Sequence, residues 1–315
     1  MDLTNWEDAQ RKVREWESGI KEPVHVSSDD AVVQFVADLE ARNLANATIK
    51  KYRHTLEKIL TPFCAGKKLA HIDQITGSDM IALRTTWKGA PMTLLKRFDR
   101  LRTFFIFCER NGWCGNPCRG LKPPKVSQKP TLPFTDEEMG KVLEACDKFG
   151  TTGKYGAASG KRVKAFVLIM RYTGLRIGDT VQLSKENVQD GKVFLTTQKT
   201  GVQVRVPVPS CVVAALSEIE GLSRHYFWNG TGTVLSAVSV WQRTLQRLFK
   251  AAGISNGHSH RFRSSFACAL LQKNVSLENV AVLLGNSPAI VEKHYSAFVA
   301  SRQAILEKQV METWA

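Results

Sequence analysis

The stretch HSHRFRSSFACALL, residues 258–271, places two imidazoles and two guanidiniums directly ahead of an apolar segment. Burying such a cluster in a protein core would require a partner for every charge, so an anion is the natural partner. The apolar residues that follow predict a buried helix, which would fix the position of the polar cluster at its start.

Three other residues in the second half of the chain could join this cluster in chemistry. Arg176 comes shortly after Gly174, a glycine suited to ending a helix. Lys199 lies between two β-branched segments, in a turn that contains Gly201. Tyr295 stands in the sequence EKHYSAF. Each of them alone also has an ordinary explanation as a surface arginine, a solvated turn lysine or a packed tyrosine.

The segment that must position these residues begins after a stretch rich in proline and lysine. Residues 119–133, RGLKPPKVSQKPTLP, have the composition of a linker. A capping box follows, formed by Thr135 and Glu138, with Phe134 and Met139 placed for a hydrophobic staple. We therefore expect a second domain over residues 134–315, in which GKVFLTTQ and VQVRVPVP form a hairpin among helices.

The first part of the chain reads as helices throughout. A short helix is expected within the N-terminal extension, residues 1–26, and a helical bundle over residues 27–118. Two of the bundle helices carry an excess of basic residues on the face away from their apolar stripe. Solvated charge explains most such faces, but the single sign favours a surface that contacts phosphates. The candidate DNA-binding residues are Lys50, Lys51, Arg53, Lys96, Arg97 and Arg100.

The composition narrows the class of protein. The 315 residues carry 44 Lys and Arg against 29 Asp and Glu, a net charge of +15 that favours a polyanionic partner such as DNA or RNA. No apolar run approaches the roughly 18 residues of a membrane span, and no signal-peptide pattern is present, so we expect a cytoplasmic protein, nucleoid-associated if bacterial. The seven cysteines suit free thiols, and Cys114 and Cys118 lack the second ligand pair of a metal site.

Three ordered motifs together resemble the tyrosine recombinase (phage integrase) family. They are TGLRIGD at residues 173–179, HRFRSSFA at residues 260–267 and LLGNSPAIVEKHYS at residues 283–296. The resemblance covers all but about the first 25 residues. It implies a mainly α fold with a small antiparallel β-sheet, made of a helical core-binding domain and a mixed α/β catalytic domain.

The resemblance also implies a role for each motif residue in cutting DNA. Tyr295 would be the nucleophile that forms a 3′-phosphotyrosyl link, while Arg176 and Arg263 would grip the phosphate oxygens. Lys199 would be the general acid for the leaving hydroxyl, and His260 would assist proton transfer or phosphate binding. The family needs no metal or other cofactor, so we expect activity in EDTA.

Four further residues near these motifs have less certain roles. The family often has an acid at the position of Asp179, to orient active-site groups, although a carboxylate at a helix N-terminus is an equal explanation. Asn286 stands where the family usually has His or Trp; its amide can donate to a phosphate oxygen but cannot relay a proton. His258 and Arg261 inherit no role and are expected to contact the DNA backbone or solvent.

The tail, ASRQAILEKQVMETWA, predicts a helix with Leu306, Val310 and Trp314 on one face. It packs either on its own domain or, as the resemblance implies, on a neighbouring protomer of a tetramer assembled on double-stranded DNA. Two other functions stay open: a non-catalytic DNA-binding protein on the same fold, which the Asn286 departure favours, and a type IB topoisomerase. The intact set of five catalytic residues favours a recombinase over a binder.

Overall fold

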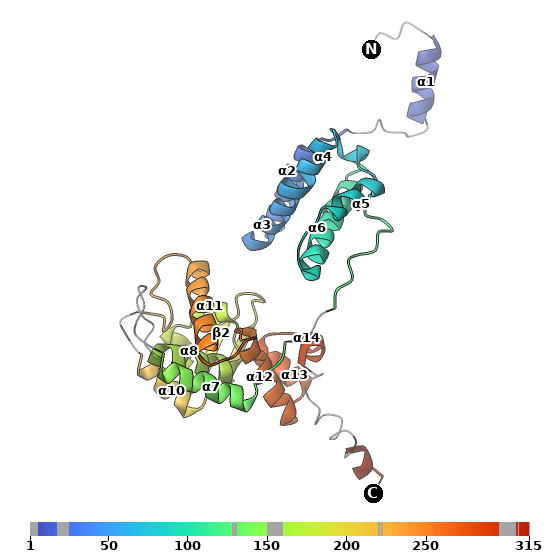
Figure 1. Ribbon diagram of the computed structural model, residues 1–315. Coiled ribbons are helices and arrows are strands. Elements are labelled where there is room, and N and C mark those ends of the chain that lie inside the picture. The colour runs from blue at the N-terminus through green and yellow to red at the C-terminus, as the bar shows by residue number, and fades with distance from the viewer. Residues whose placement is uncertain are drawn as a thin grey trace. The chain divides into compact units, whose positions relative to one another are not determined.

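The computed structural model describes residues 6–17, 25–127, 131–149, 160–219, 221, 223–295, 307 and 309–314. The chain divides into two compact units, Met1–Gln128 and Lys129–Ala315 (Figure 1). Helices dominate both, and the second also holds a three-stranded antiparallel sheet. The predicted fold class, mainly α with a small antiparallel sheet, is confirmed.

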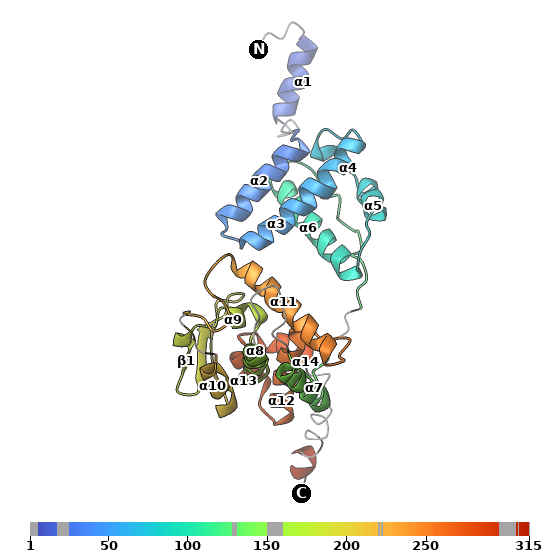
Figure 2. The same cartoon turned by 60° about the vertical axis from the view of Figure 1, so that its left-hand side comes forward.

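The first unit is helical over its described residues, as expected (Figure 2). Its elements are α1 (Trp6–Glu17), α2 (Ser28–Ala41), α3 (Asn46–Thr55), the π-helical turn η1 (Leu56–Leu60), α4 (Thr61–Gly66), the 3₁₀ turn η2 (Ile72–Gln74), α5 (Gly77–Thr85) and α6 (Pro91–Arg110).

Aromatic packing holds this bundle together. The ring of Phe35 on α2 meets Tyr52, Phe104 and Phe107 edge-on, at centroid distances of 5.2 to 5.5 Å. Such T-shaped pairs stabilise the bundle beyond what burial of the rings alone contributes. They bring α3 and α6, the two helices with basic faces, against the same core.

The second unit surrounds its small sheet with helices, and the catalytic motifs lie on its later elements. These elements are α7 (Asp136–Asp147), α8 (Gly160–Thr173), α9 (Ile177–Val181), η3 (Lys185–Asn187), β1 (Val188–Gln189), β2 (Lys192–Thr196), β3 (Gln203–Pro207), α10 (Ser210–Ser217), α11 (Val234–Ala251), α12 (His260–Gln272), α13 (Leu277–Leu284) and α14 (Pro288–Tyr295).

The start of α7 has the predicted capping box. The Thr135 side chain accepts from the Glu138 N–H at 3.1 Å, and the Glu138 carboxylate accepts from the Thr135 N–H at 3.0 Å. Phe134 and Met139, the predicted staple residues, are both buried in the core of the unit. These bonds satisfy donors that a helix start leaves unpaired.

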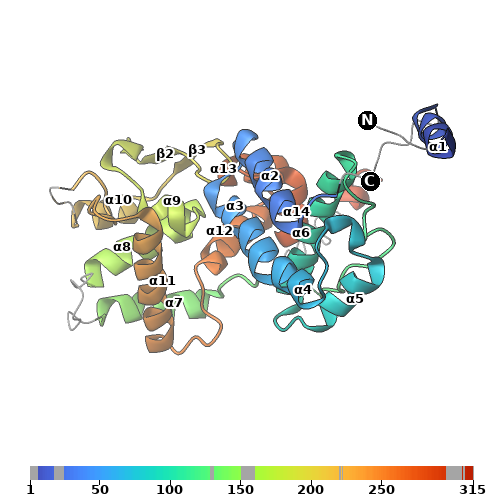
Figure 3. The same ribbon diagram turned by 90° about the horizontal axis from the view of Figure 1, so that it is seen from above.

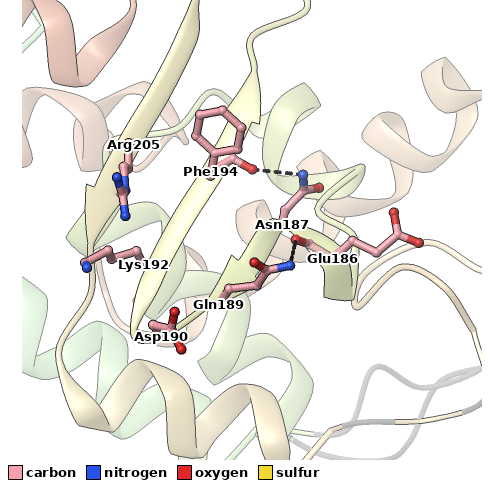
Figure 4. Close-up of a pocket in the computed structure, with 7 residues that line it drawn as sticks. All are labelled: Glu186, Asn187, Gln189, Asp190, Lys192, Phe194 and Arg205. Carbon is pink, nitrogen blue, oxygen red and sulfur yellow. Dashed lines mark hydrogen bonds between the residues drawn. The ribbon is translucent and has the colours of Figure 1, made fainter.

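The predicted hairpin is β2 and β3, and β1 adds a short third strand in the order β1-β2-β3. Leu195 pairs with Val204 on the buried face, and Phe194 pairs with Arg205 on the outer face. The outer face is hollowed by a pocket of about 300 Å³ (Figure 4), which none of the candidate catalytic residues lines. Among the described residues, no helix has both the length and the hydrophobicity needed to span a membrane.

Candidate active site

Arg176 reaches the site from a sharp turn between two helices. Helix α8 ends at Thr173, Gly174 adopts a φ of +63°, and Arg176 becomes the N-cap of α9. The Arg176 Nη2 donates to the Asn286 side-chain oxygen at 2.8 Å, while its Nη1 is buried without a hydrogen-bond partner among the described residues. A buried guanidinium N–H left in this way is a donor available to an anion.

Gly174 is required at this turn for two reasons. Its positive φ is unfavourable for any residue with a side chain. A Cβ built there would also lie 2.6 Å from Phe266 Cδ1 and 2.8 Å from Leu284 Cδ2. The Gly174 carbonyl in turn accepts from Arg263, so the turn supports both arginines.

We expect Gly174→Ala to lower the free energy of unfolding by about 2–5 kcal/mol, from left-handed strain together with overpacking. Gly253→Ala is the matched control, because Gly253 has a φ of +69° but nothing within 4 Å of its Cβ position. The control should lose only the conformational part, about 1–2 kcal/mol. Urea denaturation of both variants measures the difference, and equal losses would contradict the packing argument.

Arg263 is the most enclosed charge of the site, at 2% exposure. Its Nη1 donates to the Gly174 carbonyl and its Nη2 to the Leu284 carbonyl, both at 2.8 Å. The guanidinium also interacts electrostatically with the phenol of Tyr295. Burial first, and then the charge of Arg176, lower the pKa of Arg263 to about 10, so it stays protonated at neutral pH.

Tyr295 is the last residue of α14 and is 6% exposed. Its ring belongs to a small apolar cluster of α12, α13 and α14 that includes Leu284 and Val291. The ring is therefore fixed by packing, and its phenol lies within the electrostatic influence of Arg263. This arrangement presents a tyrosine oxygen next to a buried cation.

His260 begins α12 and is exposed to solvent. Desolvation first, then the charges of Arg263, His258, Arg176 and Lys199, lower the pKa of His260 below its ordinary value. Because their charges act on His260, Lys199, Arg176 and Arg263 lie near its imidazole. The lowered pKa favours the neutral imidazole at neutral pH.

We expect the His260 ring to titrate below its ordinary value of about 6.5 in a histidine NMR titration. The folded protein binds a proton on His260 less readily than the unfolded chain does. This difference stabilises the folded protein fully at pH values above the ordinary histidine pKa of about 6.5. The stabilisation is lost as the pH falls from there through the lowered pKa. Sulfate held by the arginines should raise the His260 pKa again. The control is His225, whose pKa is lowered by burial and Arg224 and should not respond.

Lys199 lies at the tip of the β2–β3 turn, exposed, and two bonds fix its neighbours. The Asp179 Oδ1 accepts from the Gln198 backbone N–H at 2.9 Å, and the Thr200 hydroxyl donates to the Gly285 carbonyl at 3.1 Å. Figure 3 shows β3 beside α13. The turn is thus tied to the elements that carry Arg176 and Asn286, a contact that no sequence pattern had indicated.

Asn286 lies in the turn between α13 and α14, after Gly285 with its φ of +59°. Because arginine can only donate, the amide atom that faces Arg176 is the oxygen. The Asn286 NH₂ group is then left to donate elsewhere. The sequence had suggested this donor but not the bond that orients Arg176.

The expectation that Arg261 contacts the DNA backbone or solvent is wrong. Its side chain is only 7% exposed and is buried within the second unit. It is bound by Glu138 and by the carbonyls of Leu132 and Pro133. Sequence reasoning missed these partners because they lie more than 120 residues earlier in the chain. His258 is exposed, as expected.

The candidate DNA-binding residues lie on α3 and α6 of the first unit. Lys50, Lys51 and Lys96 are exposed. Three arginines are partly engaged within the unit: Arg53 with Glu40 and Glu57, Arg97 over the Trp87 ring, and Arg100 with the Thr55 hydroxyl.

The last part of the chain is described only at residues 307 and 309–314. Val310 and Trp314 are 43% and 75% exposed there. Leu306, the third residue of the predicted apolar face, lies outside the described residues. Within the described ranges, no group of three or more His, Cys, Asp or Glu side chains is arranged to hold a metal ion.

Comparison with known proteins fits this fold. Residues 133–300, just over half of the chain, match the Phage integrase family. The chain therefore belongs to the phage integrase family, the tyrosine recombinases. The tyrosine recombinase XerC of Oceanobacillus iheyensis is 27% identical over 264 residues, covering 78% of this chain and 83% of the relative.

Two solved structures share the fold. A lambda integrase tetramer bound to a Holliday junction superposes with a TM-score of 0.68 at 19% identity, covering 92% of this chain and 86% of that one. XerH site-specific recombinase, bound to a palindromic difH substrate in a post-cleavage complex, gives 0.67 at 19% identity, covering 97% and 89%.

Proposed function

We propose that this chain is a site-specific DNA recombinase that cuts and rejoins strands through a 3′-phosphotyrosyl intermediate. The observation that carries the proposal is the nearly buried Tyr295 phenol, close enough to the buried Arg263 guanidinium to interact with its charge. The unpartnered Nη1 of Arg176 adds a second donor for the same phosphate. Family membership supports the reaction class.

The reaction would proceed by exchange of one phosphoester for another. The Tyr295 hydroxyl gives its proton to the neutral His260 imidazole as its oxygen attacks the phosphorus; a bond from tyrosine to phosphorus forms, and the bond from phosphorus to the 5′ oxygen breaks. Lys199 gives that oxygen its proton. The lowered pKa of His260 favours the neutral imidazole that accepts the tyrosine proton. Attack by a 5′ hydroxyl on the phosphotyrosine then reverses the steps and rejoins a strand.

Two further residues would position the cationic side chains of Arg176 and Lys199. Asn286 holds Arg176 through its amide oxygen and offers its NH₂ group to the phosphate. Asp179 fixes the turn that carries Lys199, through the Gln198 N–H. Asparagine cannot exchange protons as histidine does, so this site would depend more on Lys199 and His260 for proton transfer.

The two domains would divide DNA binding and chemistry. Residues 27–118 would form the core-binding domain and contact phosphates through basic residues of α3 and α6. Residues 119–133 would be the linker, residues 134–315 the catalytic domain, and residues 1–26 an extension. The main proposed phosphate contacts are Lys50, Lys51, Arg53, Lys96, Arg97 and Arg100.

The exposed tail supports assembly of the enzyme on DNA. Val310, Met311 and Trp314 present apolar surface at 43%, 63% and 75% exposure. A tetramer in which each tail docks on a neighbouring protomer would cover it. Lambda integrase, a fold neighbour, forms a tetramer on a Holliday junction.

Covalent capture tests the proposal without a known target. The protein is mixed with a library of nicked duplexes of random sequence, denatured, and recovered with any DNA attached, which is then sequenced. A recombinase should yield attachment at a 3′ end and an enriched sequence. Salt-sensitive DNA binding without attachment to any sequence would favour the non-catalytic binder. Relaxation of supercoiled plasmids by a monomer would favour the topoisomerase.

We expect covalent attachment to proceed at the same rate in EDTA as in Mg²⁺. Two arginines, a lysine and a histidine converge on the phosphate position, and such cations can supply the electrostatic stabilisation that metal ions give other phosphoryl transfers. The captured sequence, incubated with chelator and then with restored Mg²⁺, provides the measurement. Loss of attachment in EDTA with recovery on adding metal would contradict this mechanism.

A further inference from the structure

Arg261, next to His260, is held by four hydrogen bonds within the second unit. Its Nε donates to the Leu132 carbonyl at 3.1 Å and its Nη2 to the Pro133 carbonyl at 2.9 Å. Nη1 and Nη2 also donate to the two carboxylate oxygens of Glu138. We call these four residues the Arg261 clamp. It uses four of the five donors of a guanidinium.

A second contact joins the same two segments. The Ser265 hydroxyl, one helical turn beyond Arg261, accepts from the Phe134 N–H at 2.7 Å and donates to the Arg261 carbonyl at 3.0 Å. The Phe134 ring lies under the Arg261 guanidinium at 4.2 Å and beside Phe262 at 4.8 Å. One face of α12 is therefore fixed to residues 132–135, where the predicted linker ends.

The other side of the same helical turn carries the chemistry. Arg263, two residues after Arg261, points away from the clamp toward Gly174 and Leu284. The start of α12 has no conventional cap, because the Ser259 side chain makes no capping hydrogen bond. The first turn is therefore held by side chains from other elements on both sides.

We propose that Arg261 is a positioning residue: the Arg261 clamp fixes the first turn of α12 against the end of the linker and thereby orients His260 and Arg263 toward the scissile phosphate. This inference rests on the proposed function. It adds a residue that takes no part in the proposed chemistry but determines the positions of His260 and Arg263.

Stability alone does not account for a clamp of this kind. Apolar side chains of similar volume commonly stabilise a core as well as a buried ion pair does, or better. What the pair adds is direction, since a guanidinium fork meets a carboxylate and two carbonyls in only one orientation. Burial alone would raise the pKa of Glu138, but bonds from Arg261 and the Thr135 N–H outweigh it and lower the pKa, which keeps the carboxylate charged.

Histidine NMR titration tests the clamp without any DNA. His258 senses the Arg261 charge, which lowers the His258 pKa after desolvation. The charges that lower the His260 pKa are those of Arg263, His258, Arg176 and Lys199, not that of Arg261. In Arg261→Met we expect both values to rise, His260 because its turn loosens into solvent. In Arg261→Lys, which keeps the charge but not the fork, His258 should stay and His260 should still rise.

Arg224→Met is the matched control. Arg224 pairs with Glu186 at 2.8 Å in the same unit, but both side chains are about two-thirds exposed, at 68% and 67%. Loss of the Arg224 charge should change the pKa of His225 and leave the pKa of His260 unchanged. An unchanged His260 value in folded Arg261→Met would overturn the positioning role, whether or not the chain cuts DNA.

The kinetic arm uses the captured DNA sequence. Arg261→Met should form the covalent complex about 10- to 100-fold more slowly, as expected for a small displacement of catalytic groups. DNA affinity should stay unchanged. Glu138→Gln should add little to Arg261→Met, because both break one unit. If Arg261→Met forms the covalent complex at the wild-type rate but a smaller fraction of its molecules reacts, the substitution has only reduced the amount of folded protein. That result would overturn the proposal. Absence of attachment by the wild type would instead count against the proposed function.

Discussion

Tyr295→Phe is expected to abolish covalent attachment to DNA, with a loss of more than about 10⁴-fold, because the variant has no nucleophilic oxygen. The phenylalanine ring keeps the packing against Leu284 and Val291, so the unit should fold. The variant loses only the electrostatic interaction of the phenol with Arg263. Denaturing gels of protein incubated with the captured DNA sequence measure the attachment.

Two comparisons make this result specific. Tyr172 lies at the end of α8 and packs against the larger core of the same unit, not in the cluster that contains Tyr295. Tyr172→Phe should therefore attach to DNA as the wild type does. DNA affinity of Tyr295→Phe should equal that of the wild type. Attachment that survives in Tyr295→Phe would show that another side chain is the nucleophile.

Arg263→Lys is expected to slow strand cleavage by about 10²- to 10³-fold, the usual loss when a donor to a developing negative charge is removed. A lysine ammonium cannot hold the Gly174 and Leu284 carbonyls and still reach the tyrosine and a phosphate. The Tyr295 oxygen would also lose its neighbouring guanidinium. Single-turnover formation of the covalent complex measures the rate.

The matching control is Arg243→Lys on the exposed face of α11, where the guanidinium donates to the Ser239 carbonyl of its own helix. That exchange should leave the rate unchanged. Thermal unfolding of both variants separates chemistry from stability. If Arg263→Lys cleaves at the wild-type rate, phosphate binding by a guanidinium fork at this position is contradicted.

Local sequence signals were sufficient for most of the elements. The capping box of Thr135 and Glu138 fixes the start of α7 within four residues, and the glycines at 174 and 201 end a helix and turn a hairpin through backbone conformations that other residues avoid. The two basic helices were visible because apolar residues recur with helical period between the charges. Such signals act over one or two turns, so the sequence carries them directly.

The order of three motifs, through their resemblance to a family, also predicted which residues would form the site. Their contacts required the tertiary structure. Asn286 accepts from Arg176 across 110 positions, and Asp179 accepts from the residue before Lys199. Partners at such distances depend on the packing of separate elements, which no local pattern encodes.

Arg261 shows the difference most directly. Its sequence position, between a histidine and an arginine of the motif, suggested a side chain turned toward DNA or water. The fold instead brings the end of the linker against α12, where Glu138 and two carbonyls enclose the guanidinium. The sequence alone determined that an arginine stands at the start of this helix. Only the tertiary structure decided that its charge is neutralised inside the protein, because a buried cation must find its partners wherever the chain places them.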